Sequence, residues 1–187
     1  NDFILLTRNK PPAEYYGFCG RCSIPEILDE VKTGNRVVID DGKIITEVVD
    51  IKAEGVLLRV KSISPEGKKL KNDKGINFPD CECHISPITK KDKADIKFIL
   101  QNADILGYSF VQKIEDIDLL EEEIKNSEII NKNLGIIAKI ETKLAVNNLP
   151  ELITRVAGKF PLAIMIARGD LAVEIGYERL AEIQEEI

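Results

Sequence analysis

Three polar positions that follow apolar runs could carry chemistry in this 187-residue chain. Lys139 and Glu141 end one apolar run, and Asp170 follows the next run along the chain. Residues two apart on a strand point to the same face, so Lys139 and Glu141 would present a cation and a carboxylate to one site. If the two strands are neighbours, Glu141 and Asp170 supply two hard oxygen ligands of the kind that Mg²⁺ or Mn²⁺ binds. The pattern fits an enolate-forming or phosphoryl-transferring site.

The residues around these positions leave two interpretations open. Gly169 would let the backbone approach a ligand closely, and the amides of Gly169 and Asp170 would face an anion such as a carboxylate. Alternatively, Lys139 and Glu141 form only an ion pair and Asp170 only caps the following helix. Ser109 and Phe110 would line the same edge, although a serine at a strand end is as often a structural hydrogen-bond donor. Glu174 lies beyond the strand end, so we expect it either to support the ligands of the site indirectly or to have a structural role.

The elements that must position these residues begin near Thr89. From there apolar runs alternate with amphipathic segments, which is typical of βα units and a parallel sheet. The predicted strands are 104–110, 135–141 and 162–167, and the predicted helices are 93–100, 114–124, 144–156 and 179–187. Side chains at the carboxyl ends of such strands face the ligand site in parallel βα folds. We therefore expect the polar positions to converge there.

The first half of the chain reads as β structure instead. Short β-branched runs predict strands at 3–7, 36–39, 44–49 and 55–60. Asp40-Asp41-Gly42 predicts a hairpin, because Asp-Gly tolerates the positive φ angles of a type I′ turn. Ser23 as a cap with Glu26 three residues later predicts a short helix through Val31. A compact antiparallel barrel would follow from these elements.

Composition narrows the class of partner. The net charge is −6 and the pI is about 5.0, with no basic stripe, which argues against nucleic-acid binding and favours small-molecule partners. The longest apolar runs are far too short for a bilayer span, so we expect no membrane segment. Nothing at the N-terminus resembles a targeting segment, and we expect the chain to begin inside a longer protein.

Four cysteines are too few for a disulfide-stapled scaffold, which favours a reducing cytoplasm. Their spacing still permits a metal site. Cys19 and Cys22 form a C-x-x-C pair, and Cys81, Cys83 and His84 could complete a tetrahedral zinc site. The alternative is a set of buried or half-exposed thiols in strands.

Several segments, in order along the chain, resemble the pyruvate kinase family. Residues 136–141 and 165–175 resemble two characteristic barrel motifs of that family. Segments 38–44, 74–79 and 89–96 resemble its lid hairpin, the return segment of the lid and the entry to the barrel. Ala172 stands where the family typically has Gly, and 15–24 resembles common members weakly. Segments 19–25 and 176–186 look more like a bacterial pyruvate-kinase-like branch.

The resemblance implies an α/β fold, part of a (β/α)₈ TIM barrel preceded by a small all-β barrel lid. Residues 1–86 would form the lid domain and residues 87–187 the fourth to sixth βα segments of the barrel. The family's K⁺ ligands, an arginine before the lid and a catalytic threonine on a later strand would all lie outside this chain. The chain alone is therefore expected to lack turnover and to associate through open sheet edges.

The implied reaction is phosphoryl transfer from phosphoenolpyruvate to ADP, giving pyruvate and ATP. By resemblance, Lys139 is the catalytic cation and a substrate ligand, Glu141 and Asp170 hold Mg²⁺ or Mn²⁺, and the amides of Gly169 and Asp170 bind the substrate. Lys74 would bind the nucleotide phosphates. We expect the parent protein to be a cytoplasmic homo-oligomer.

Two alternatives come from other classes. A metal-dependent aldolase or lyase acting on a 2-oxo acid could also hold Mg²⁺ with a Glu and an Asp at strand ends. A non-catalytic relative could keep the fold and bind metabolites. An inserted β domain and Lys74 favour the kinase over the lyase, and the joint presence of Lys139, Glu141 and Asp170 argues against the non-catalytic relative.

Overall fold

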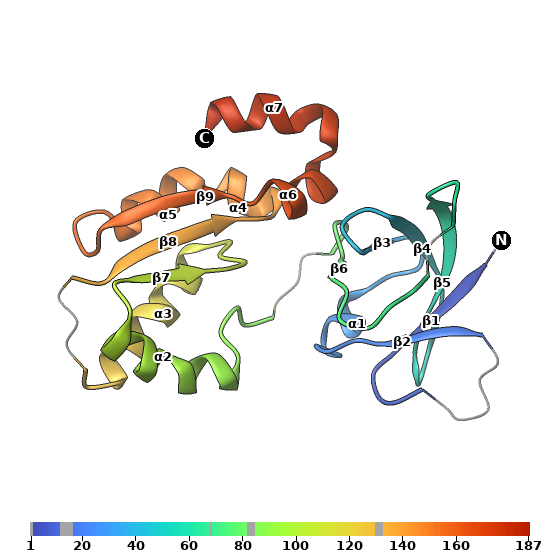
Figure 1. The fold of residues 1–187 in the computed structure, drawn as a ribbon, viewed down its shortest axis with the longest axis horizontal. Coiled ribbons are helices and arrows are strands. Elements are labelled where there is room, and N and C mark those ends of the chain that lie inside the picture. The colour runs from blue at the N-terminus through green and yellow to red at the C-terminus, as the bar shows by residue number, and fades with distance from the viewer. Residues whose placement is uncertain (1, 12–16, 68, 82–84, 130–132) are drawn as a thin grey trace. The chain divides into compact units, whose positions relative to one another are not determined.

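A computed structural model describes residues 2–11, 17–67, 69–81, 85–129 and 133–187. The chain divides into two compact units, Asn1–Ile85 and Ser86–Ile187 (Figure 1). None of the helices in the described part of the chain is both long and apolar enough to cross a membrane.

The first unit is a curled sheet with one short helix. Its elements are β1 (Phe3–Thr7), β2 (Phe18–Arg21), α1 (Ile27–Glu30), β3 (Arg36–Ile39), β4 (Ile44–Lys52), β5 (Gly55–Ile63) and β6 (Ile76–Asn77). The strand order is β2-β1-β5-β4-β3-β6. The sequence predicted an antiparallel sheet, and this is wrong for one pairing. Strand β1 pairs with β2 in parallel, and the other pairings are antiparallel. The closure of the sheet into a lid barrel stays a prediction.

Alternation of apolar and polar residues gives this sheet one packed face. In β4, Ile44, Thr46 and Val48 are buried while their neighbours are more exposed. The Thr46 hydroxyl donates a 2.7 Å hydrogen bond to the carbonyl of Val37, so its burial leaves no polar group unpaired. The register between β4 and β5 shifts at two places, and such irregularities bend and twist a sheet.

The predicted hairpin is present, and the predicted helix cap is not. Strands β3 and β4 pair antiparallel around residues 40–43, where Asp40, Asp41 and Gly42 all have positive φ. Helix α1 begins at Ile27, and Glu26 occupies its N-cap position. Ser23 is therefore not the cap. The amides of Ile27 and Leu28 bond to the carbonyls of Ile24 and Pro25 in a preceding turn, which delays the start of the helix.

The second unit is a three-stranded parallel sheet with helices. Its elements are α2 (Lys90–Asn102), β7 (Ile105–Tyr108), α3 (Ile114–Asn126), β8 (Gly135–Ile140), α4 (Lys143–Asn147), α5 (Leu149–Val156), β9 (Leu162–Ile166), α6 (Arg168–Ile175) and α7 (Tyr177–Glu186). The strand order is β7-β8-β9 and both pairings are parallel. The predicted alternation of strands and helices is therefore confirmed.

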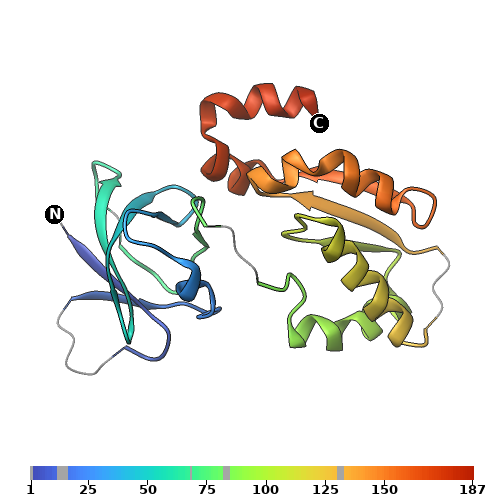
Figure 2. The same cartoon turned by 180° about the vertical axis from the view of Figure 1, so that it is seen from behind.

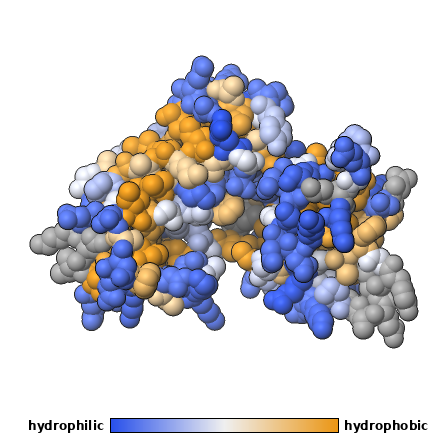
Figure 3. Space-filling view, viewed as in Figure 1, coloured by the Kyte–Doolittle hydropathy of each residue, from blue (hydrophilic) through white to orange (hydrophobic). Residues whose placement is uncertain are grey.

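One face of this sheet forms the core. Helices α2, α3 and α5 lie on that face, as Figure 2 shows from behind. The buried cluster includes Leu106, Ile136, Leu120 and Leu152, which come from two strands and two helices. On the opposite face of the sheet, Ile105 of β7 is 57% and Met165 of β9 is 48% exposed. Apolar surface accordingly gathers over the strands in Figure 3.

Local sequence explains where the boundaries of three elements differ from prediction. The predicted helix 144–156 is two helices, because Pro150 at the start of α5 has no N–H to donate to a preceding turn. Helix α2 begins earlier than predicted, at a capping box made by Thr89 and Asp92. Strand β7 ends at Tyr108, before Phe110, whose φ of 54° is incompatible with a strand.

Candidate active site

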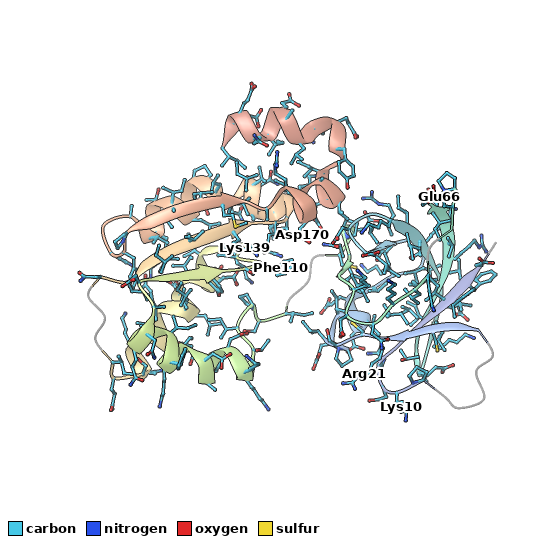
Figure 4. The ribbon with its side chains drawn as sticks, viewed as in Figure 1. Lys10, Arg21, Glu66, Phe110, Lys139 and Asp170 are labelled. Carbon is cyan, nitrogen blue, oxygen red and sulfur yellow. The ribbon has the colours of Figure 1, made fainter. Side chains whose placement is uncertain are left out.

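The carboxyl ends of β7, β8 and β9 meet at one edge of the sheet. Tyr108 pairs with Ala138, and Ile140 pairs with Ile166, so the three strands end close together. The amide of Ala167 donates a 3.1 Å hydrogen bond to the carbonyl of Ile140, which continues this alignment past the end of β9. Figure 4 shows Phe110, Lys139 and Asp170 gathered at this edge.

Lys139 and Glu141 are in direct contact there. The ammonium nitrogen of Lys139 lies 2.7 Å from Oε1 of Glu141. The Glu141 side chain is only 2% exposed and that of Lys139 is 26% exposed. A carboxylate so deeply buried needs charged or hydrogen-bonding partners, because desolvation disfavours an isolated charge. The sequence-based expectation that these side chains share a face therefore agrees with the geometry.

The turn after β7 supplies two further contacts. The Lys139 ammonium group donates a 2.8 Å hydrogen bond to the hydroxyl of Ser109. The amide of Phe110 donates a hydrogen bond to Oε2 of Glu141. Sequence reasoning placed Ser109 and Phe110 at this edge but gave the Phe110 backbone no role. The only signal for it was the position of the turn directly after a strand.

Asp170 lies in the first turn of α6, on the segment that follows the neighbouring strand. Ala167, and not Asp170, occupies the N-cap position of this helix. Leu171 donates the helix's first bond from its amide, 2.9 Å from the carbonyl of Ala167. The amides of Gly169 and Asp170 come before this bond, in the turn where backbone N–H groups face outward from a helix end.

Gly169 opens onto free space. A β-carbon built at Gly169 meets no described atom within 4 Å. The backbone at the start of α6 is therefore accessible to a ligand, as the sequence pattern suggested.

Lys74 belongs to the first unit and is ion-paired there. Its ammonium nitrogen lies 3.0 Å from Oδ1 of Asp40, in the turn between β3 and β4. Lys43 approaches the same oxygen at 3.4 Å. The hydrogen bond from Lys74 is the main cause that lowers the pKa of Asp40 from its ordinary value, and Lys43 adds to it. In this arrangement Lys74 is paired with the buried carboxylate of Asp40.

The possible zinc ligands are only partly within the described residues. Cys83 and His84 lie outside them. Cys22 is buried and donates from its thiol to the carbonyl of Ile24 at 3.2 Å, and burial raises its thiol pKa. Cys81 donates to Oδ1 of Asn35 at 3.6 Å. Over the ranges that the structure describes, no group of three or more His, Cys, Asp or Glu side chains could hold a metal ion.

The geometry of the second unit defines a class of protein: a parallel α/β fold with a lysine, a buried glutamate and an aspartate at the carboxyl edge of its sheet. Comparison with known proteins makes the class specific. The family model described as pyruvate kinase, barrel domain, matches residues 21–187. The chain belongs to the pyruvate kinase family.

Individual relatives agree with this assignment. The chain is 34% identical over 186 residues to the pyruvate kinase of Thermotoga maritima, covering 99% of this chain and 37% of that protein. It is 37% identical over 163 residues to the pyruvate kinase of Geobacillus stearothermophilus, covering 86% of this chain and 26% of that protein. It is 33% identical over 177 residues to the pyruvate kinase of Clostridium perfringens, covering 93% of this chain and 35% of that protein. The chain thus spans about a quarter to just over a third of these relatives' length.

Proposed function

We propose that the protein carrying this chain transfers a phosphoryl group from phosphoenolpyruvate to ADP, giving pyruvate and ATP. One observation carries the proposal: the ion pair of Lys139 with the buried Glu141 lies at the carboxyl edge of a parallel sheet, where Asp170 follows the adjoining strand. Family membership supports the same reaction.

In the proposed reaction, Lys139 stabilises negative charge. A terminal oxygen of ADP forms a bond to phosphorus, the bond from phosphorus to the enol oxygen breaks, and the enolate then takes a proton at carbon. A fixed cation placed where charge develops lowers the barrier directly. Lys139 suits this role because Ser109 and Glu141 both bind its ammonium group and restrict its position.

Glu141 and Asp170 are the proposed ligands of Mg²⁺, with Mn²⁺ as a substitute. Their carboxylates are the hard oxygen donors that these ions prefer, and two protein carboxylates leave room for substrate oxygens and water. Glu141 fits a ligand's role because both its oxygens already have donors that fix its orientation. A divalent cation bound there would supply positive charge to the substrate oxygens and the phosphoryl group.

The remaining proposed contacts concern substrate and nucleotide. The Gly169 and Asp170 amides would donate to the substrate carboxylate, in keeping with the open space at Gly169. Lys74 would bind the nucleotide phosphates, for which it must exchange its bond to Asp40 for one to a phosphate oxygen. Any K⁺ ligands would come from residues outside this chain.

The test is a steady-state assay of pyruvate and ATP formation by the full-length protein with Mg²⁺. Lys139→Met is expected to lower kcat by about 10³-fold or more, because the developing charge loses its cation. Lys143→Met is the matched control, since Lys143 is an exposed lysine in the first turn of α4. Activity of Lys139→Met above about a tenth of wild type would contradict the proposal, as a surface ion pair alone would permit it.

A further inference from the structure

The turn between β7 and α3 holds a bulky residue in an unusual backbone conformation. Phe110 has a φ of 54°, which is the left-handed region that residues other than glycine rarely occupy. Its side chain is 48% exposed, so burial of the ring does not account for this conformation. Strained backbone of this kind persists only where the surrounding structure enforces it.

The following residues of the turn are firmly held. The carboxylate of Asp116 accepts hydrogen bonds from the amides of Gln112 at 2.8 Å and Lys113 at 3.1 Å. The side-chain amide of Asn148 donates to the carbonyl of Gln112 at 2.9 Å. Val111 is fully buried. These contacts fix the chain directly after Phe110 and leave its backbone little choice of conformation.

The left-handed conformation of Phe110 directs its backbone N–H at one oxygen of the Glu141 carboxylate. The Phe110 amide bonds to Oε2 of Glu141, while Lys139 contacts Oε1. Each oxygen of the buried carboxylate therefore has its own donor, and the two donors come from different strand ends. With only the lysine as a partner, the carboxylate could rotate about its terminal torsion, which has a broad energy profile.

We propose that Phe110 is a positioning residue whose backbone N–H holds the Glu141 carboxylate in the orientation that binds the divalent cation. The inference rests on the proposed role of Glu141 as a metal ligand. Carboxylates that bind metals are commonly oriented by hydrogen bonds, and loss of such a partner typically weakens metal affinity by about 10–100-fold.

The direct test removes the N–H and leaves the side chain in place. Incorporating phenyllactic acid at position 110 of the full-length protein replaces the amide with an ester. Mn²⁺ affinity is then measured by the electron paramagnetic resonance signal of free Mn²⁺, without substrate. The dissociation constant is expected to rise by about 10–100-fold.

A matched ester controls for the chemical change itself. Phenyllactic acid at position 160 removes the amide that donates to the carbonyl of Val156 at 3.4 Å, away from the carboxyl edge of the sheet. Mn²⁺ affinity should stay within about twofold of wild type in this variant, because no donor to Glu141 is lost.

Phe110→Gly separates the amide from the ring. Glycine keeps the N–H and adopts positive φ without steric cost, so Mn²⁺ affinity should stay within about threefold of wild type. If the glycine variant loses as much affinity as the ester at 110, the ring and not the amide is responsible, and the inference is wrong.

The remaining outcomes distinguish this inference from the proposed function. If the ester at position 110 leaves Mn²⁺ affinity unchanged while Glu141→Gln weakens it, the proposed role of Phe110 is wrong and Glu141 remains a ligand. Mn²⁺ binding that is unaffected by Glu141→Gln overturns the metal site itself, and the role of Phe110 with it.

Discussion

Two glycines, one in each sheet, differ in how closely neighbouring chain segments approach them. At Gly55, where β5 begins, a β-carbon would lie 2.0 Å from the carbonyl oxygen of Leu6 on β1. At Gly107, in the middle of β7, a β-carbon would meet no described atom within 4 Å. Gly55 is therefore closely packed against β1, whereas Gly107 lies on a face of the second sheet that also carries the exposed side chains of Ile105 and Met165.

The two lysines that the sequence singled out also differ in their surroundings. Lys74 binds Asp40 at a turn, and its side chain is 36% exposed. Lys139 binds Glu141 at the end of a strand, where the Glu141 carboxylate also has a backbone donor. Function is expected where rigid elements present polar groups at an accessible edge.

Alanine substitution at the two glycines would break this comparison most strongly. Gly55→Ala is expected to lower the free energy of unfolding by about 3 kcal/mol, because the new methyl group collides with backbone at a position of positive φ. Gly107→Ala should raise it by about 0.5–1 kcal/mol, since alanine loses less conformational entropy than glycine. Urea unfolding of both variants measures the difference, and equal effects would show that neighbouring segments approach Gly55 and Gly107 equally closely.

Substitution of the proposed metal ligands sharpens the comparison at the site. Glu141→Gln and Asp170→Asn each replace a charged oxygen ligand with a neutral one of similar volume, so the Mn²⁺ concentration for half-maximal activity should rise by about 10–100-fold. Far-ultraviolet circular dichroism should stay unchanged in both. An unchanged metal requirement in both variants would mean that the site lies elsewhere.

The smallest expected effect concerns the ion pair at the turn of the first unit. Lys74 holds the pKa of Asp40 below its ordinary value of 3.8, so the folded state binds this proton less readily than the unfolded state. The stabilisation is complete above the unfolded pKa and is lost as the pH falls through the lower, folded pKa.

The measurement is a pair of urea titrations at pH 7 and at about pH 3. Asp40→Asn should lower the urea midpoint at pH 7 and have less effect at the acid pH. In a Lys74→Met background, Asp40→Asn should lower the urea midpoint by a smaller amount at pH 7, because the main partner of Asp40 is already absent. If Asp40→Asn lowers the urea midpoint equally with and without Lys74, coupling between the two side chains is excluded.

Several features of the fold and the site followed from sequence patterns alone. Alternation of strands and helices predicted a parallel sheet, and a spacing of two residues predicted that Lys139 and Glu141 would meet. Asp41-Gly42 predicted the hairpin correctly. These succeeded because the period of a strand and the φ preference of a turn act locally.

Other features depended on contacts that no local pattern encodes. Phenylalanine does not favour positive φ, so nothing at position 110 indicated the left-handed turn that binds Glu141. The parallel pairing of β1 with β2 joins segments across an intervening loop. By contrast, the break at Pro150 and the Thr89–Asp92 capping box are encoded by local sequence signals.

We propose that Glu141 and Asp170, at the carboxyl edge of β7, β8 and β9, bind a divalent cation. Anomalous diffraction from crystals of the full-length protein grown with Mn²⁺ tests this claim directly. The account predicts an anomalous peak within about 2–2.3 Å of a carboxylate oxygen of each residue. A peak bound to other side chains, with the Lys139–Glu141 pair unchanged and no metal at Asp170, would contradict it.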